Sequence, residues 1–241
     1  MPAYWQDSRK PRYSLLLALP LFLIYQVLEA LEPPTHGGAL RNGADVILET
    51  LFSRLAGPRG PMLLAVCLVA VGLWLVIRDY RKSGRELHFT VLLLMLLEAT
   101  VLALGFGIIV SAITSQLVRP TAMLQQQDVA QLPVSTRLML SLGAGLYEEL
   151  LFRVLLVGSL AWAGRRLLRW RPLVAGIWAA LIGAVVFSAF HYVGPYGDQL
   201  TSYSFVFRTI AGLAFSALFL LRGFGITAWT HALYDAFLLL R

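Results

Sequence analysis

Residues 87–118 read LHFTVLLLMLLEATVLALGFGIIVSAITSQLV, and Glu98 is the single Asp, Glu, Lys or Arg in this run. The hydrocarbon core of a bilayer is about 30 Å thick and needs roughly 20 apolar residues of helix to cross it. The run is therefore predicted to span a membrane, with a candidate break at Gly105-Phe106-Gly107 that would divide it into two spans. Comparable apolar stretches occupy 13–31, 61–77, 138–163, 172–192, 203–221 and 224–240.

The composition of the whole chain agrees with this pattern. Of the 241 residues, 58% are apolar and 14% are charged, against roughly 45–50% and 25% in soluble domains. The mean hydropathy is +0.72. These values exclude a disordered chain and argue against a water-soluble globule. The predicted fold is all-α, a polytopic membrane helix bundle of about seven (six to eight) transmembrane helices that forms one integral membrane domain over 1–241.

Between the first two spans, residues 39–55 predict an amphipathic helix that lies in the membrane interface. Ala44 and Leu48 recur at helical spacing on an apolar face, whereas Asp45 and Glu49 fall on other faces. A helix with one apolar and one charged face is typical of the boundary between lipid and water.

The charge distribution predicts how the chain crosses the membrane. The net charge is +7, which in a soluble protein would indicate nucleic acid binding. Here twelve Lys and Arg lie in the N-terminal segment and every second loop after it, and six lie in the other loops. By the positive-inside rule the N-terminus is cytoplasmic. We therefore expect a multi-pass protein of a bacterial inner (cytoplasmic) membrane, with the lipid bilayer and not nucleic acid around it.

Ionisable side chains inside the predicted spans mark where chemistry is expected. Each costs at least about 2.5–3.5 kcal/mol at the centre of a bilayer, so each is a functional candidate. Most of them fall in the second half of the chain, and about 138–241 is predicted to be the catalytic core. The candidates are Glu29, Glu98, Glu148, Glu149, Arg153, His191, Arg208, His231 and Asp235.

Two adjacent glutamates are predicted to have different tasks. Glu149 and Arg153 are one helical turn apart, so they are expected to pair and to offset each other's burial. Glu148 points about 100° away from Glu149 and has no cation at i+3 or i+4. A carboxylate in that position is suited to take a proton near neutral pH.

Two histidines can complete a site with these acids. His231 and Asp235 are four residues apart on the last span, and His191 ends an earlier one. In the core of a helix bundle, such side chains can hold a water molecule between a carboxylate and an imidazole.

These motifs resemble those of the CAAX prenyl endopeptidase and related proteins (CPBP) family of intramembrane glutamate proteases. That family has two adjacent glutamates with an arginine four residues after the second. It also has a phenylalanine four residues before a histidine, and a histidine four residues before an asparagine or aspartate. The matching positions are Glu148, Glu149 and Arg153; Phe187 and His191; and His231 and Asp235.

The resemblance implies an endopeptidase that uses no metal and no other cofactor. In such an enzyme Glu148, helped by His191, activates the water that attacks the scissile carbonyl. Glu149 and Arg153 set the position of the first carboxylate.

By the same resemblance, His231 and Asp235 stabilise the oxyanion. Aspartate replaces the commoner asparagine here, so Asp235 can donate a hydrogen bond only when it is protonated. The expected substrate is a membrane-associated protein or peptide, cut during maturation or C-terminal processing.

Other functions remain open for the same residues. A metal-dependent membrane protease could use them as ligands, and a transporter relays protons along comparable chains of Glu and His. A non-enzymatic immunity protein is a third alternative. The absence of Gly-x-Ser-x-Gly and His-Glu-x-x-His disfavours serine and zinc-helix proteases.

Arg208 is interpreted as snorkelling to the interface, with a bond to Asp235 as the alternative. Residues 1–130 carry no motif, and the sequence does not set the oligomeric state.

Overall fold

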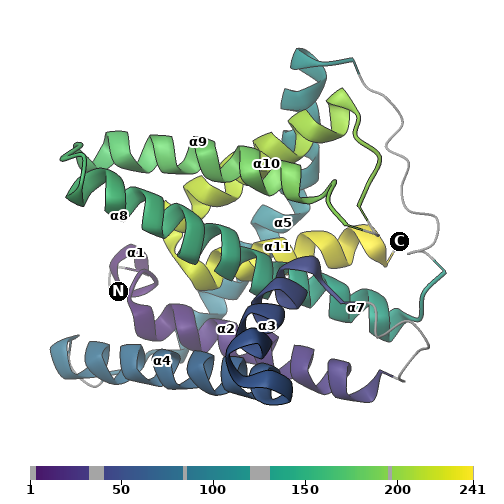
Figure 1. Ribbon diagram of the computed structural model, residues 1–241. Coiled ribbons are helices and arrows are strands. Elements are labelled where there is room, and N and C mark those ends of the chain that lie inside the picture. The colour runs from purple at the N-terminus through teal and green to yellow at the C-terminus, as the bar shows by residue number, and fades with distance from the viewer. Residues whose placement is uncertain (1–3, 33–40, 84–85, 120–130, 195–196, 241) are drawn as a thin grey trace.

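The computed structural model describes residues 4–32, 41–83, 86–119, 131–194 and 197–240. Within these ranges every regular element is a helix, as the sequence predicts (Figure 1). The N-terminal half contains α1 (Tyr4–Asp7), α2 (Pro11–Leu31), α3 (Gly43–Ala56), the short 3-10 turn η1 (Gly57–Arg59), α4 (Gly60–Ser83) and α5 (Phe89–Leu117). The C-terminal half contains α7 (Val134–Gly143), η2 (Ala144–Val157), α8 (Gly158–Arg166), α9 (Pro172–Phe190), α10 (Ser202–Arg222) and α11 (Phe224–Leu239).

Among the described residues, five helical stretches are long and apolar enough to cross a membrane. They are Pro11–Leu31, Gly43–Lys82, Phe89–Leu117, Pro172–Phe190 and Ser202–Arg222. The other two predicted spans, 138–163 and 224–240, are also helical. The first lies in the run α7–η2–α8, which carries Glu148, Glu149 and Arg153. The second lies in α11, whose 16 residues extend about 24 Å and are shorter than a hydrocarbon core of about 30 Å. Length and composition alone do not mark these two runs as spans, and the crossing of the membrane at both stays a prediction.

Helix α11 lies in the middle of the bundle, with α9 and α10 on one side and α2 on the other (Figure 1). It packs against α2, α5, α7, η2 and α10. Gly223 connects α10 to α11. Its φ is +83°, a backbone conformation that glycine adopts with little strain because it has no Cβ atom. The next turn is anchored because the Gly225 N–H donates to the Ser14 hydroxyl of α2 at 2.6 Å. The C-terminal helix, which carries two motif residues, is thus held from several sides.

The candidate break in the long apolar run is wrong, because α5 continues without interruption from Phe89 to Leu117. The glycine pair has a packing role instead. A Cβ atom at Gly107 would lie 2.9 Å from the Tyr234 ring of α11, so glycine lets the two helices approach closely. Phe106 lies on the same contact, 5.1 Å from the Tyr234 ring centre.

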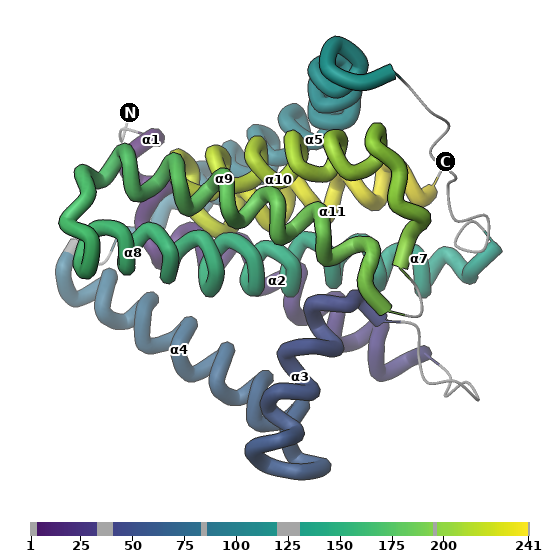
Figure 2. Tube along the Cα trace, turned by 45° about the horizontal axis from the view of Figure 1, so that its top comes forward, coloured from purple at the N-terminus to yellow at the C-terminus, as the bar shows by residue number. Residues whose placement is uncertain are grey.

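Helices α3 and α4 form a V that opens toward the rest of the bundle (Figure 2). Residues 39 and 40 of the predicted amphipathic helix lie outside the described residues, and α3 begins at Gly43. Ala44 and Leu48 are buried as predicted, but Asp45 is fully buried too, contrary to the prediction. Burial is tolerated because Tyr25 donates a hydrogen bond to Asp45 and Arg41 pairs with it at 2.5 Å. The interfacial position of α3 stays a prediction.

Candidate active site

The adjacent glutamates lie on η2, which is wound as a π-helix and not as the predicted α-helix. In this winding an N–H group bonds five residues back, as the Gly158 N–H does to the Arg153 carbonyl. π-helical turns are rare and occur frequently at functional sites. Because η2 contacts α3, α9, α10 and α11, Glu148 and Glu149 both face protein although they point in different directions.

Arg153 and Glu149 form the predicted pair in the protein interior. Arg153 is 1% exposed and Glu149 is fully buried. The Arg153 Nε lies 3.1 Å from Glu149 Oε2. The guanidinium also lies over two aromatic rings, with its carbon 4.3 Å from the centre of the Phe187 ring and 5.3 Å from that of Phe215. A carboxylate and two ring faces thus surround the buried cation, and cation–π contacts are strongest when desolvated.

His231 links the two glutamates. Its Nδ1 is 2.7 Å from Glu149 Oε1, and an imidazole bound to a carboxylate there donates its Nδ1–H. Its Nε2 is 3.9 Å from Glu148 Oε2 and 3.6 Å from Asp235 Oδ2. The ring stacks on Phe215 at 4.3 Å between centroids. His231 therefore has a fixed orientation, with Nε2 aimed at the gap between Glu148 and Asp235.

Glu148 has one oxygen engaged and one directed into the site. Its Oε1 accepts a hydrogen bond of 2.8 Å from the side-chain amide of Asn42. Its Oε2 is buried, and no described residue hydrogen-bonds to it. The side chain as a whole is 6% exposed. This pattern leaves Oε2 as the atom of Glu148 able to accept a proton from a small molecule.

His191 follows the last residue of α9 and is held by its own helix. Its Nδ1 lies 2.9 Å from the Phe187 carbonyl, so in the neutral ring Nδ1 carries the proton and Nε2 keeps its lone pair. The Phe187 ring meets the His191 ring edge-on, with centroids 4.8 Å apart. The centroid of the same Phe187 ring lies 6.3 Å from that of His231, so Phe187 contacts both imidazoles. The structure thus brings His191 to the site with Nε2 available as a base.

Arg208 does not bind Asp235, so that alternative is wrong. It forms an ion pair with Asp198 and donates a hydrogen bond of 3.1 Å to the Tyr192 hydroxyl. These partners lie between α9 and α10, beyond His191. The Asp235 side chain is 24% exposed and pairs with His231, whose Nε2 lies 3.6 Å from Asp235 Oδ2.

Three contacts at the site were not predicted from the sequence. Phe187 matched the family pattern, but no role followed from it, and Phe215 was not singled out. Asn42 lies in the half of the chain without motifs. The sequence placed Asn42 inside the helix predicted for 39–55, whereas α3 begins at Gly43 and Asn42 is its N-cap, a position that asparagine favours.

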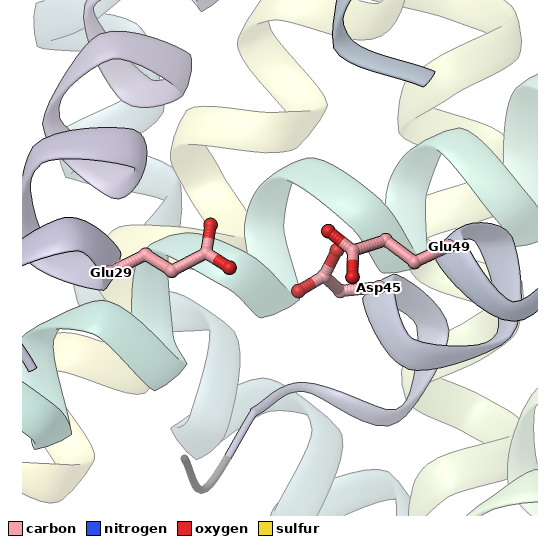
Figure 3. A group of neighbouring side chains, drawn as sticks. All are labelled: Glu29, Asp45 and Glu49. Carbon is pink, nitrogen blue, oxygen red and sulfur yellow. The ribbon is translucent and has the colours of Figure 1, made fainter. Parts of the chain in front are cut away.

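A potential metal-binding group lies elsewhere. Among the described residues, three potential ligand atoms come within 4.8 Å of one another only at Glu29, Asp45 and Glu49, whose carboxylates face one another (Figure 3). The Arg41 guanidinium already pairs with all three, at 2.9, 2.5 and 2.6 Å respectively. The group is therefore a compensated ion cluster.

Comparison with known families agrees with the geometry. Residues 130–237 match the family model described as type II CAAX prenyl endopeptidase Rce1-like. All six predicted site residues fall inside the match, whereas Asn42 falls outside it. Comparisons with curated proteins and with solved structures gave no match. The match confirms the resemblance drawn from the motifs: residues 130–237, which contain all six predicted site residues, are similar to the Rce1-like family of type II CAAX prenyl endopeptidases.

Proposed function

We propose that this protein is an intramembrane glutamic peptidase that hydrolyses a peptide bond near or within the bilayer. The observation that carries the proposal is the asymmetry of Glu148. One of its oxygens is held by an amide, while the other is buried without a described partner beside an imidazole. A positioned carboxylate of this kind can act as a general base toward water.

In the proposed reaction Glu148 and His191 activate the water. Glu148 Oε2 takes one proton as the water oxygen bonds to the scissile carbonyl carbon. The Nδ1–H of His191 donates to the Phe187 carbonyl. Nε2 therefore keeps its lone pair and helps to orient the water. Collapse of the tetrahedral intermediate breaks the C–N bond, and the proton passes to the leaving amine. The products are a carboxylic acid, which retains the second proton of the water until it ionises, and an amine.

The remaining residues stabilise charge. His231, when protonated at both nitrogens, donates through Nε2 to the oxyanion, and a protonated Asp235 adds a second donor. Glu149 supports the imidazolium form because it accepts from Nδ1 at 2.7 Å. Arg153 acts one step further out, by holding Glu149 at 3.1 Å.

The proposed substrate is a membrane-associated protein or peptide, cut during maturation or at its C-terminal end. The family description, a CAAX prenyl endopeptidase, supports cleavage near a membrane-bound C-terminus. We place the protein in the inner membrane of a bacterium with its N-terminus in the cytoplasm, on the basis of the Lys and Arg distribution.

The test compares membrane proteins from cells of the native host that lack the gene and carry either the wild type or a variant. Mass spectrometry identifies C-termini that the wild type generates. We expect Glu148→Gln and His191→Ala to abolish these products. The matched control is Glu98→Gln, which alters another glutamate of a membrane helix, one bound to Arg222 and remote from the site. We expect it to retain cleavage per folded protein.

A second arm tests the metal alternative. Purified protein is mixed with detergent-solubilised membrane proteins of the deletion strain, with and without a chelator. Under the glutamate mechanism the chelator leaves the cleavage rate unchanged. Inhibition that added zinc reverses would favour the metal-dependent protease. Identical C-termini with wild type and Glu148→Gln would refute the peptidase proposal.

A further inference from the structure

Asn42 uses both ends of its side-chain amide. Its Oδ1 accepts a hydrogen bond of 2.9 Å from the Ala44 N–H and so caps α3. Its Nδ2 donates to Glu148 Oε1 at 2.8 Å. Because a backbone N–H can only donate, the first bond fixes which end of the amide is oxygen. The donor end is therefore the one that faces Glu148.

Asn42 is itself held in place by an ion cluster at the N-terminus of α3. Its neighbour Arg41 binds Glu29 of α2 and two carboxylates of α3, Asp45 and Glu49, which converge in Figure 3. Burial lowers the pKa of Arg41, but the hydrogen bond to Glu49 and the charge of Asp45 raise it by more, so its net pKa is above the usual value. Arg41 thus stays charged and ties the start of α3 to α2.

The neighbouring helices are shaped to admit the Asn42 side chain. A Cβ atom at Gly143 would lie 3.2 Å from Asn42 Cβ and 2.8 Å from a ring carbon of Tyr25. The Tyr25 ring also packs edge-on against Tyr147, the residue before Glu148, at 5.1 Å between centroids. The contact to Glu148 therefore belongs to a packed junction of α2, α3 and η2.

We propose that Asn42 is a positioning residue that fixes the Glu148 carboxylate with Oε2 directed at the water-binding side of the site. This inference rests on the proposed function, because it assigns Glu148 the part of general base. A charge-assisted hydrogen bond to Oε1 stops the carboxylate from rotating. Asn42 does not touch the reacting atoms. Through this contact the N-terminal half of the chain, outside the family match, helps to build the site.

Three substitutions separate this role from helix capping. Asn42→Ser keeps a good N-cap but is too short to reach Glu148. Asn42→Asp keeps the cap and replaces the donor with a second carboxylate. Asn42→Ala removes both functions. Cleavage of the detergent-solubilised membrane proteins of the deletion strain is measured with each purified variant across pH, together with its melting temperature.

We expect Asn42→Ser to melt only somewhat below the wild type, because Glu148 Oε1 loses one buried hydrogen bond, and to cleave about ten- to a hundredfold more slowly, the loss typical of a misplaced catalytic group. Asn42→Ala should be as slow and melt at a still lower temperature. Asn42→Asp should move the acidic limb of the pH–rate profile to higher pH, because two adjacent carboxylates hold a shared proton. A role limited to capping would not move that limb.

The inference is overturned if Asn42→Ser cleaves at the wild-type rate while Glu148→Gln is inactive. Should Asn42→Ser fail to fold, the pH profile of Asn42→Asp decides, and an unchanged profile overturns the inference. If Glu148→Gln cleaves like the wild type, the proposed function itself fails, which is a separate result from a failure of Asn42 alone.

Discussion

Loss of the Arg153 charge is expected to destabilise the fold strongly. Arg153→Met keeps a long apolar side chain between Phe187 and Phe215 but leaves Glu149 buried without its cation. Removing one partner of a buried ion pair costs about 3–5 kcal/mol. For a chain of this length 1 kcal/mol lowers the melting temperature by roughly 2–4 °C. The expected decrease in detergent is therefore about 6–20 °C.

The assay is a double-mutant cycle on melting temperature and folded yield. Glu149→Gln leaves Arg153 unpaired but keeps an acceptor for His231. The double variant Glu149→Gln/Arg153→Met removes both charges, so it should cost clearly less than the sum of the single changes. Arg165→Met, at an exposed position of the same helical run, is the control and should change stability by less than about 0.5 kcal/mol. Additive losses in the cycle would refute the reasoning that the two charges compensate each other.

Two further predictions concern packing and orientation. A Cβ atom at Gly145 would lie 2.4 Å from a carbonyl oxygen of α11, so Gly145→Ala should lower stability by about 1–3 kcal/mol. Gly72→Ala, where the added atom meets nothing within 4 Å, should not destabilise; equal losses at both positions would contradict the close-packing argument. For orientation, the Lys and Arg count predicts that Gly194 and Ser202 lie outside the cytoplasm. In a Cys67→Ser background, cysteines at these two positions should react with a membrane-impermeant thiol reagent on intact cells. Labelling only after the cells are opened would invert the topology.

Contacts within one helix could be predicted from the sequence because helix geometry fixes them. Glu149 and Arg153 meet as expected from their spacing, even though η2 is π-helical. His231 and Asp235 approach to 3.6 Å for the same reason. The helices were predictable too, since long apolar runs leave no alternative at membrane depth.

Contacts between distant helices could not be predicted. Asn42 is 106 residues from Glu148, and nothing local to either residue encodes their meeting. Phe215 has no polar signal that separates a ring over a guanidinium from a ring in lipid. The glycine pair around Phe106 was ambiguous, because glycine fits both a helix break and a close helix contact. Only the position of Tyr234 on α11 decides between them.

The proposed mechanism balances the charge of the site with protons and not with a metal ion. Three carboxylates face one guanidinium, and burial makes the excess of negative charge costly. A divalent cation could relieve it, but both oxygens of Glu149 are engaged, by His231 and Arg153, and one oxygen of Glu148 is engaged by Asn42. The atoms that remain are Glu148 Oε2, His231 Nε2 and the Asp235 carboxylate, and His231 Nε2 lies 3.9 Å from Glu148 Oε2 and 3.6 Å from Asp235 Oδ2. Protons on His231 and Asp235 relieve the same excess without moving any side chain. In the proposed mechanism the same two protons are the donors to the oxyanion, so the protonation that offsets the buried negative charge would also serve the reaction.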